Sequence, residues 1–266
     1  MTAGDGYTAD EASKYWEHYS GLMTYIEDTI IADRARGCLA EIGKLRGSPA
    51  AGLLDLPADK FRCLDYGCGS GEAYDVLCKL MPQLSGSYAW YTGMDPSPAM
   101  IGMDRPIWRA GLRLSVGGFK ELAAIHTLHT GATPGMPVGG LGKRLYSLGV
   151  CMHSALHMNS VEFMAVMSSM LNLCSAVLVV VASAARVNSD RVMRTGCDLH
   201  ARSLEEYANW IECSGADVRV NCELAVRHEV RKTMRLETEY AFPAEKEDGV
   251  DYLVLAATRM PRGDSK

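Results

Sequence analysis

Short apolar runs alternate with amphipathic segments along most of the chain, and their lengths suit strands and helices respectively. Residues 8–46 carry apolar side chains at mostly three- and four-residue spacings, which predicts helices with a break at Gly21. Strands are predicted at seven apolar or alternating runs: 61–64, 88–95, 112–116, 145–152, 177–181, 218–240 and 252–257. The runs 61–64 and 177–181 are apolar enough to be buried on both faces, which is typical of a parallel sheet.

Helices are predicted between the strands: at 72–80, after Ser97, at 158–173, and from a Ser203 capping box to Gly215. This alternation predicts an α/β protein with a mostly parallel sheet and helices on both faces. The run 252–257 is expected to be the last strand and to pair antiparallel with 218–240. Residues 120–143, which include the Gly- and Pro-rich loop 131–142, receive no assignment.

Length and composition are those of one globular domain. The 266 residues suit a single domain 1–266, with a helical cap at 1–46 and a core at 60–258. The net charge of −5 gives no electrostatic reason to expect a nucleic acid partner. Nine cysteines without a C-x-x-C pair indicate neither a disulfide framework nor a metal site, so they are expected to be core residues in a reducing compartment.

Membrane and secretory signals are not expected from the sequence. The amino terminus has no basic region before an apolar run, and the longest apolar run, 176–182, is far shorter than the roughly 20 residues of a membrane helix. We therefore expect a cytoplasmic protein without a membrane partner.

A glycine-rich turn follows the first strand and carries the clearest chemical signal in the chain. The strand 61–64 ends in Asp65, glycine occupies every second position from 67 to 71, and a helix begins at Glu72. Glycines there would let the backbone approach a nucleotide at the amino end of a helix. A dinucleotide fingerprint requires glycine where Glu72 stands, which disfavours a nicotinamide cofactor. The alternative is that the turn is only a strand-to-helix connection.

A second acid, Asp95, ends the next predicted strand. A carboxylate there could accept hydrogen bonds from both hydroxyls of an adenosine ribose. The order acid, any, Gly, any, Gly, any, Gly after a strand, followed by an acid after the second strand, resembles motif I and the ribose-binding acid of the class I S-adenosylmethionine (SAM)-dependent methyltransferases. The resemblance implies a Rossmann-like seven-stranded sheet, an amino-terminal helical lid and SAM as the cofactor.

The resemblance also implies which residues contact the cofactor. Many relatives place an aspartate against the adenine after the third strand, whereas this chain has Gly118 and Phe119, so backbone and ring contacts are expected there. Tyrosines in the amino-terminal segment would attract the sulfonium through their ring faces. The cofactor-binding residues implied are Asp65, Gly67, Cys68, Gly69, Gly71, Asp95, Pro96, Met100, Gly118, Phe119, Tyr15 and Tyr19. The alternative for the amino-terminal helices is that they simply cover the sheet.

The acceptor is expected to bind beyond the fourth strand, because the carboxyl ends of central strands face the ligand crevice of such sheets. His153 is therefore the candidate catalytic base, although a histidine beside a helix start is also often a structural group. The residues expected to contact the acceptor are Trp16, His157, His200 and Arg202.

The function predicted is methyl transfer from SAM to a nitrogen or oxygen atom of a small molecule, of the kind found in specialised metabolism. An Asn- or Asp-Pro-Pro-aromatic sequence does not follow the fourth strand, which disfavours nucleic acid bases as acceptors. The alternative is a SAM-binding partner subunit or sensor that transfers no methyl group. Either protein is expected to be a monomer or homodimer without a bound metal.

Overall fold

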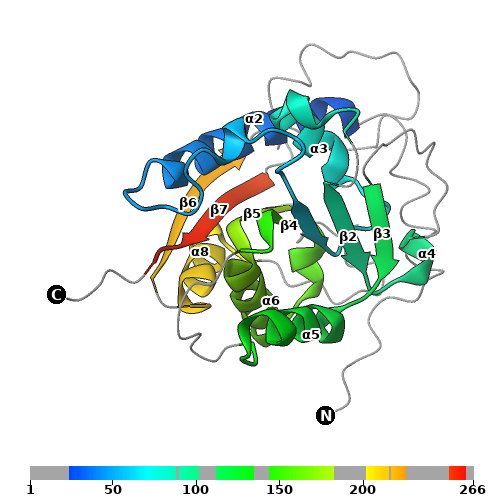
Figure 1. The fold of residues 1–266 in the computed structure, drawn as a ribbon, viewed down its shortest axis with the longest axis vertical. Helices are drawn as coiled ribbons and strands as arrows, with labels where there is room; N and C mark the ends of the chain where they lie inside the picture. Colours follow the sequence, from blue (N-terminus) through cyan, green and yellow to red (C-terminus); the bar gives the residue numbers. More distant parts are fainter. Residues whose placement is uncertain are drawn as a thin grey trace, which may run out of the picture.

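The computed structural model describes residues 24–87, 90–101, 112–134, 144–182, 202–215, 217–225 and 252–261. A seven-stranded sheet separates two layers of helices (Figure 1). The strands are β1 Cys63–Tyr66, β2 Tyr91–Asp95, β3 Leu112–Val116, β4 Tyr146–Met152, β5 Cys174–Ala182, β6 Val218–Ala225 and β7 Tyr252–Arg259. The helices are α2 Thr24–Gly43, α3 Ala73–Leu80, α4 Pro98–Ile101, α5 Phe119–Thr130, α6 Ser160–Leu173 and α8 Leu204–Cys213, with short 3-10 helices η1 Leu53–Asp55, η2 Pro82–Leu84 and η3 Ser154–His157.

The strand order is β3-β2-β1-β4-β5-β7-β6, and β7 runs antiparallel to both of its neighbours. The pairs β1–β2, β1–β4, β2–β3 and β4–β5 are parallel. The predicted seven-stranded, mostly parallel sheet with an antiparallel last strand is therefore confirmed. The chain leaves β1 towards β2 and β3 and then returns to β4, so the order reverses between β1 and β4. Ligands bind at such a reversal, outside the carboxyl ends of the strands.

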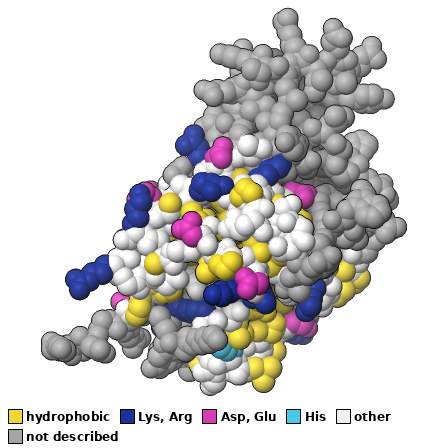
Figure 2. Space-filling model, turned by 45° about the horizontal axis from the view of Figure 1, so that its top comes forward, with side chains coloured by type: hydrophobic (Ala, Val, Ile, Leu, Met, Phe, Trp, Pro, Cys, Tyr) yellow, Lys and Arg dark blue, Asp and Glu magenta, His cyan; other side chains and the backbone are white. Residues whose placement is uncertain are grey.

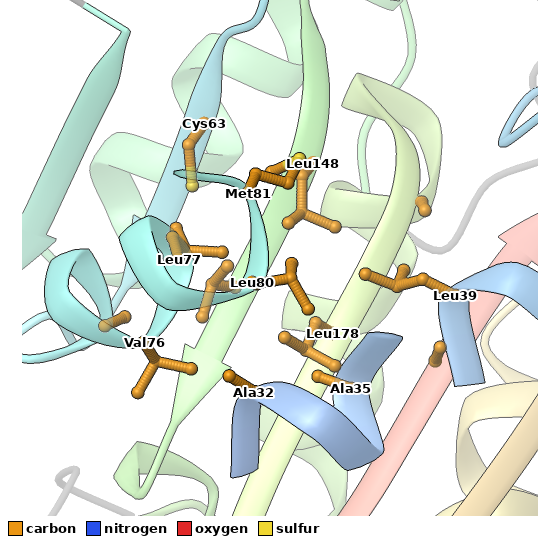
Figure 3. Close-up of a cluster of buried hydrophobic side chains, with 14 of the residues drawn as sticks. Ala32, Ala35, Leu39, Cys63, Val76, Leu77, Leu80, Met81, Leu148 and Leu178 are labelled. Atoms are coloured by element: carbon orange, nitrogen blue, oxygen red, sulfur yellow. The ribbon is translucent and has the colours of Figure 1, made fainter. Parts of the chain in front are cut away.

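Helices α2 and α3 cover one face of the sheet. The buried residues of α2 follow one another at three- and four-residue spacings and include Ala32, Ala35 and Leu39. Figure 3 shows these three side chains directed towards Leu80 of α3 and Leu178 of β5. The helix also contacts β6 and β7. Residues 24–43 of the predicted cap thus lie against the sheet, as the alternative reading of this segment expected, while Tyr15, Trp16 and Tyr19 lie outside the described residues.

Helices α5, α6 and α8 cover the other face. The predicted capping box of α8 is present, because Ser203 Oγ accepts a hydrogen bond from the Glu206 backbone N–H and the Glu206 carboxylate accepts one from the Ser203 N–H. Helix α5 lies, apart from its first residue Phe119, within the segment 120–143 that the sequence left unassigned. It begins where the Glu121 carboxylate accepts a hydrogen bond from the Gly118 N–H, 2.7 Å away.

Several strand boundaries differ from those predicted. Strand β1 covers Cys63–Tyr66 and not 61–64, so Asp65 lies within the strand, β2 begins at Tyr91 and not at 88, and β7 extends to Arg259. Strand β5 begins at Cys174, three residues before the predicted start at 177, because α6 ends at Leu173 and the chain passes directly into the strand. Strand β6 is described over Val218–Ala225, and the remainder of the predicted run, 226–240, lies outside the described residues.

On the face that Figure 2 displays, the described residues form no patch of one charge sign. Lys and Arg side chains are interspersed with Asp and Glu side chains. None of the helices in the described part of the chain has the length and apolar character needed to cross a membrane.

Candidate cofactor and acceptor site

The glycine-rich turn joins β1 to α3 in a left-handed conformation at alternate residues. The φ angles of Gly67, Gly69 and Gly71 are 69°, 54° and 89°, a region that side-chain-bearing residues rarely adopt. The backbone N–H groups of Gly67 and Cys68 donate to the Met94 carbonyl at 2.8 and 3.1 Å, which anchors the turn to β2. Three glycines are thus required at their predicted positions by the shape of this loop.

Asp95 brings the two sequence motifs together. Its Oδ2 accepts a hydrogen bond from the Gly69 N–H at 2.9 Å, and its Oδ1 accepts one from the Ser97 N–H at 2.8 Å. Burial raises the pKa of this carboxyl group, and the two backbone N–H groups partly counteract the increase. Each carboxylate oxygen has a further lone pair, so the group can accept additional hydrogen bonds from a ligand.

Asp65 is almost completely buried beside the glycine loop, with 1% of its surface exposed. The Tyr91 hydroxyl donates to Asp65 Oδ2, whereas Oδ1 is buried and has no hydrogen-bond partner among the described residues. Burial raises the pKa of Asp65 to about 7, and the negative charges of Asp95 and Glu72 contribute, while the Tyr91 hydrogen bond acts in the opposite direction. The sequence did not predict the role of Tyr91.

The Cys68 thiol is a packing group. A Cβ added at Gly93 of β2 would lie 2.7 Å from Cys68 Sγ, so this thiol occupies the space that the glycine leaves. Burial raises the pKa of the thiol well above its ordinary value. Residue 68 can therefore contribute to a ligand site only through its backbone. Within the described ranges, no group of three or more His, Cys, Asp or Glu residues could hold a metal ion.

The residues predicted to contact an adenine, Gly118 and Phe119, lie directly after β3. The Gly117 N–H donates to the Asp95 carbonyl at 2.9 Å, and a Cβ at Gly118 would lie 3.5 Å from Pro96 Cβ. The segments that follow β2 and β3 are therefore in contact. The apolar side chains of Val116 and Phe119 are 55% and 37% exposed. Met100 belongs to α4, but its side chain lies outside the described residues.

His153 stands immediately after β4 in an unusual backbone conformation. Its φ is 63°, which is uncommon for a residue other than glycine and concentrates at functional sites. Its N–H donates to the Val180 carbonyl at 2.7 Å, and its half-buried ring lies 5.4 Å from the Tyr252 ring. Tyr252 begins β7, and because β7 is antiparallel this residue lies at the edge where β4 ends. The sequence did not single out Tyr252.

Ser154 connects this turn to the glycine loop. Its Oγ donates to the Tyr66 carbonyl at 2.9 Å and lies 3.1 Å from Cys151 Sγ. A Cβ added at Gly67 would lie only 2.3 Å from Ser154 Cβ. The turn after β4 and the loop after β1 are therefore in direct contact at the point where the strand order reverses.

Arg202 stabilises η3 through hydrogen bonds to its backbone. Its guanidinium group is buried and donates to the carbonyls of Ala155 within η3 and of Met158 directly after it. It also lies 4.5 Å from the centre of the Trp210 ring. The rings of Tyr207 and Phe163 complete this cage. The arrangement favours a positioning role for Arg202 over the direct acceptor contact that the sequence predicts.

Of the other residues predicted to contact the acceptor, the structure describes His157 alone. His157 ends η3 and is exposed, four residues from His153. His200 and Trp16 lie outside the described residues.

Comparison with known proteins gives matches in structure alone. In sequence, the chain matches no family model and none of the curated proteins. Its structure is similar to that of a SAM-dependent methyltransferase from Anabaena variabilis, with a TM-score of 0.51 and 13% identity over 96% of each chain. It is also similar to the mitomycin 7-O-methyltransferase MmcR, with a TM-score of 0.51 and 13% identity over 92% of this chain and 57% of that one. The strand order, the antiparallel β7 and the similarity to these two structures lead to the same conclusion. The chain has the fold of the class I SAM-dependent methyltransferases.

Proposed function

We propose that this protein is a SAM-dependent methyltransferase that acts on a nitrogen or oxygen atom of a small molecule. The observation that carries the proposal is the contact between the Asp95 carboxylate and the glycine loop at the reversal of strand order. Glu72 adds negative charge at the end of the same loop, and Asp65 adds negative charge in its ionised form. A carboxylate on the turn itself, such as that of Glu72, repels the pyrophosphate of a dinucleotide and attracts a cationic, unphosphorylated nucleoside such as SAM.

The residues present fit this cofactor. Asp95 is placed to accept hydrogen bonds from ribose hydroxyls, and the exposed Val116 and Phe119 offer an apolar surface to the adenine. The unpartnered oxygen of Asp65 would be satisfied by the ammonium group of the methionine part. When bound, SAM supplies an electrophilic methyl group on a sulfonium centre.

The residues of the chain would then orient the acceptor and manage its proton. Methyl transfer is an in-line displacement, so alignment in a dry pocket provides much of the rate. His153, at the end of β4, is the proposed base that takes the proton from a hydroxyl or amine at its imidazole nitrogen. Tyr15, Tyr19 and Trp16 are proposed to close the site, and His157 and His200 to contact the acceptor.

A small acceptor is favoured over a nucleic acid by charge. The net charge of the chain is −5, and the described surface in Figure 2 mixes both signs. MmcR, by its name, methylates an oxygen of a small molecule. We place the present chain in the same broad class without naming its acceptor.

A transfer assay tests this function directly. The purified protein would be incubated with methyl-labelled SAM and a panel of phenols, alcohols, amines and carboxylates. Label in at least one product is expected, and it should disappear when S-adenosylhomocysteine is added in excess. Binding of SAM without transfer to any member of a broad panel would instead support the alternative, a non-catalytic SAM-binding partner or sensor.

The ribose assignment predicts the effect of Asp95→Ala. Two hydrogen bonds to a charged group contribute roughly 1.5–3 kcal/mol each, so we expect SAM affinity to fall at least tenfold in calorimetry. Asp59→Ala removes the same charge at an exposed position before β1 and serves as the control. Equal affinities for Asp95→Ala and Asp59→Ala would contradict the ribose assignment.

A further inference from the structure

The carboxyl group of Asp65 is half satisfied and lies in an acidic environment. One oxygen receives the Tyr91 hydroxyl and the other has no partner among the described residues, although the group is 1% exposed. A buried polar atom without a hydrogen bond is costly and calls for an explanation. The ionised form of this carboxyl group is disfavoured because burial removes its hydration and neighbouring carboxylates repel it.

The groups that act on Asp65 come from four packed elements. Tyr91 and Asp95 belong to β2, Cys63 to β1, Cys151 to β4, and Cys68 and Glu72 to the loop before α3. The thiols stay neutral, because burial raises the pKa of all three. Burial also raises the pKa of the Tyr91 hydroxyl, which therefore remains a hydrogen-bond donor. Tyr91 is thus the group among these that favours the ionised form of Asp65 by a direct hydrogen bond.

We propose that Tyr91 holds the Asp65 carboxyl group for the ammonium group of the cofactor, and that cofactor binding displaces a proton from Asp65 to the solvent. The inference rests on the proposed function. In the free protein near neutral pH, much of Asp65 is protonated. An arriving ammonium group donates a hydrogen bond to Oδ1 and stabilises the carboxylate, so the O–H bond breaks and the proton passes to buffer. Tyr91 acts through Asp65 and is a positioning residue.

The linkage makes cofactor affinity depend on pH. Because the pKa of Asp65 in the free protein is about 7, SAM should bind about tenfold more tightly at pH 8 than at pH 6. Calorimetry in two buffers of different ionisation enthalpy should show release of about one proton at pH 6 and about half a proton at pH 7. 5′-Methylthioadenosine, which lacks the amino acid part, should release none through Asp65.

Two variants separate the roles. Asp65→Asn should bind SAM more weakly, and its binding of SAM should release no proton from position 65 at either pH 6 or pH 7. Tyr91→Phe keeps the buried ring but loses the hydrogen bond, so Asp65 should titrate about one pH unit higher or more. Its affinity at pH 7 should be about fivefold lower than that of the parent and should recover as the pH is raised to 8. This recovery would not follow from structural damage. Tyr146→Phe, at the opposite end of β4, should behave like the parent.

Thermal unfolding without ligand provides an independent test of the free state. The pKa of Asp65 is about 7 in the folded protein and about 3.9 in an unfolded chain. Between these values the folded state holds a proton that the unfolded state has released, so stability falls as pH rises from about 4 to about 7. The Tm of the parent should therefore decrease relative to that of Asp65→Asn across this window.

The outcomes distinguish the inference from the function on which it rests. If the parent fails to bind SAM at every pH, the proposed function is wrong. If SAM binds but the parent and Asp65→Asn release the same number of protons, the function stands and the linkage is wrong. If Tyr91→Phe is weak at pH 7 and equally weak at pH 8, Tyr91 does not tune Asp65.

Discussion

Replacing Gly67 with alanine is expected to abolish measurable SAM binding or to weaken it by at least two orders of magnitude. The added Cβ would lie 2.3 Å from Ser154 Cβ, far below the 3.5–4.0 Å of an ordinary carbon contact. A side-chain rotation cannot relieve the overlap, because the atom that collides is the Cβ itself. The glycine loop or η3 must therefore move by about an ångström, which can cost about 10²-fold in a preorganised site. Calorimetry with SAM measures the loss.

Gly86→Ala is the matched control for backbone strain. Gly86 has a φ of 77°, close to the 69° of Gly67, but a Cβ there meets no atom within 4 Å. Both variants incur the roughly 1–2 kcal/mol cost of a left-handed non-glycine residue, and Gly67→Ala alone adds the collision. If the two variants bind SAM equally well, contact between the glycine loop and η3 is not needed for the cofactor site.

Loss of the His153 imidazole is expected to lower turnover by about 10²-fold while cofactor affinity changes less than threefold. The reason is that a positioned base accelerates proton removal by about 10²–10⁴-fold, whereas His153 follows β4 and does not belong to the glycine loop. The variant to use is His153→Asn, because asparagine tolerates the left-handed φ of 63°. Turnover would be measured with the acceptor identified by the labelled panel.

His153→Ala and thermal unfolding complete this test. Alanine removes the imidazole and is also strained by the left-handed φ at this position. A lower Tm for His153→Ala than for His153→Asn would therefore measure the cost of the backbone conformation and not the loss of the base. A loss of turnover smaller than threefold in His153→Asn at saturating acceptor would return His153 to a structural role beside Tyr252.

The parts of the fold and site that the sequence predicted are those set by local pattern. The central strands are continuous apolar runs, and three alternate glycines between Asp65 and a helix indicate a tight left-handed loop. Asp95 was predictable because an acid that ends an adjacent parallel strand must lie at the same edge as that loop. The structure places its carboxylate on the Gly69 N–H, in agreement with this reasoning.

The parts that the sequence did not predict depend on contacts between distant segments. Tyr91 starts a strand that reads as ordinary core, and only the pairing of β1 with β2 brings its hydroxyl to Asp65. Nothing in the sequence distinguishes Ser154 from other serines, because its contact with Gly67 exists only in the folded protein. Arg202 reads as a solvated or ligand-binding charge, because three aromatic rings from α6 and α8 surround it only after folding. Helix α5 was missed because its segment was grouped with the glycine-rich loop that follows it.

The central claim is that the loop after β1 and Asp95 form a site for SAM and not for a phosphorylated dinucleotide. A calorimetric titration of the unmodified protein with SAM, and in parallel with NAD, tests this claim most directly. The account predicts saturable binding of SAM with a Kd in the micromolar range and no detectable binding of NAD, because Glu72 stands where a dinucleotide-binding turn requires glycine and its carboxylate repels a pyrophosphate. Tight binding of NAD together with no heat from SAM would contradict it.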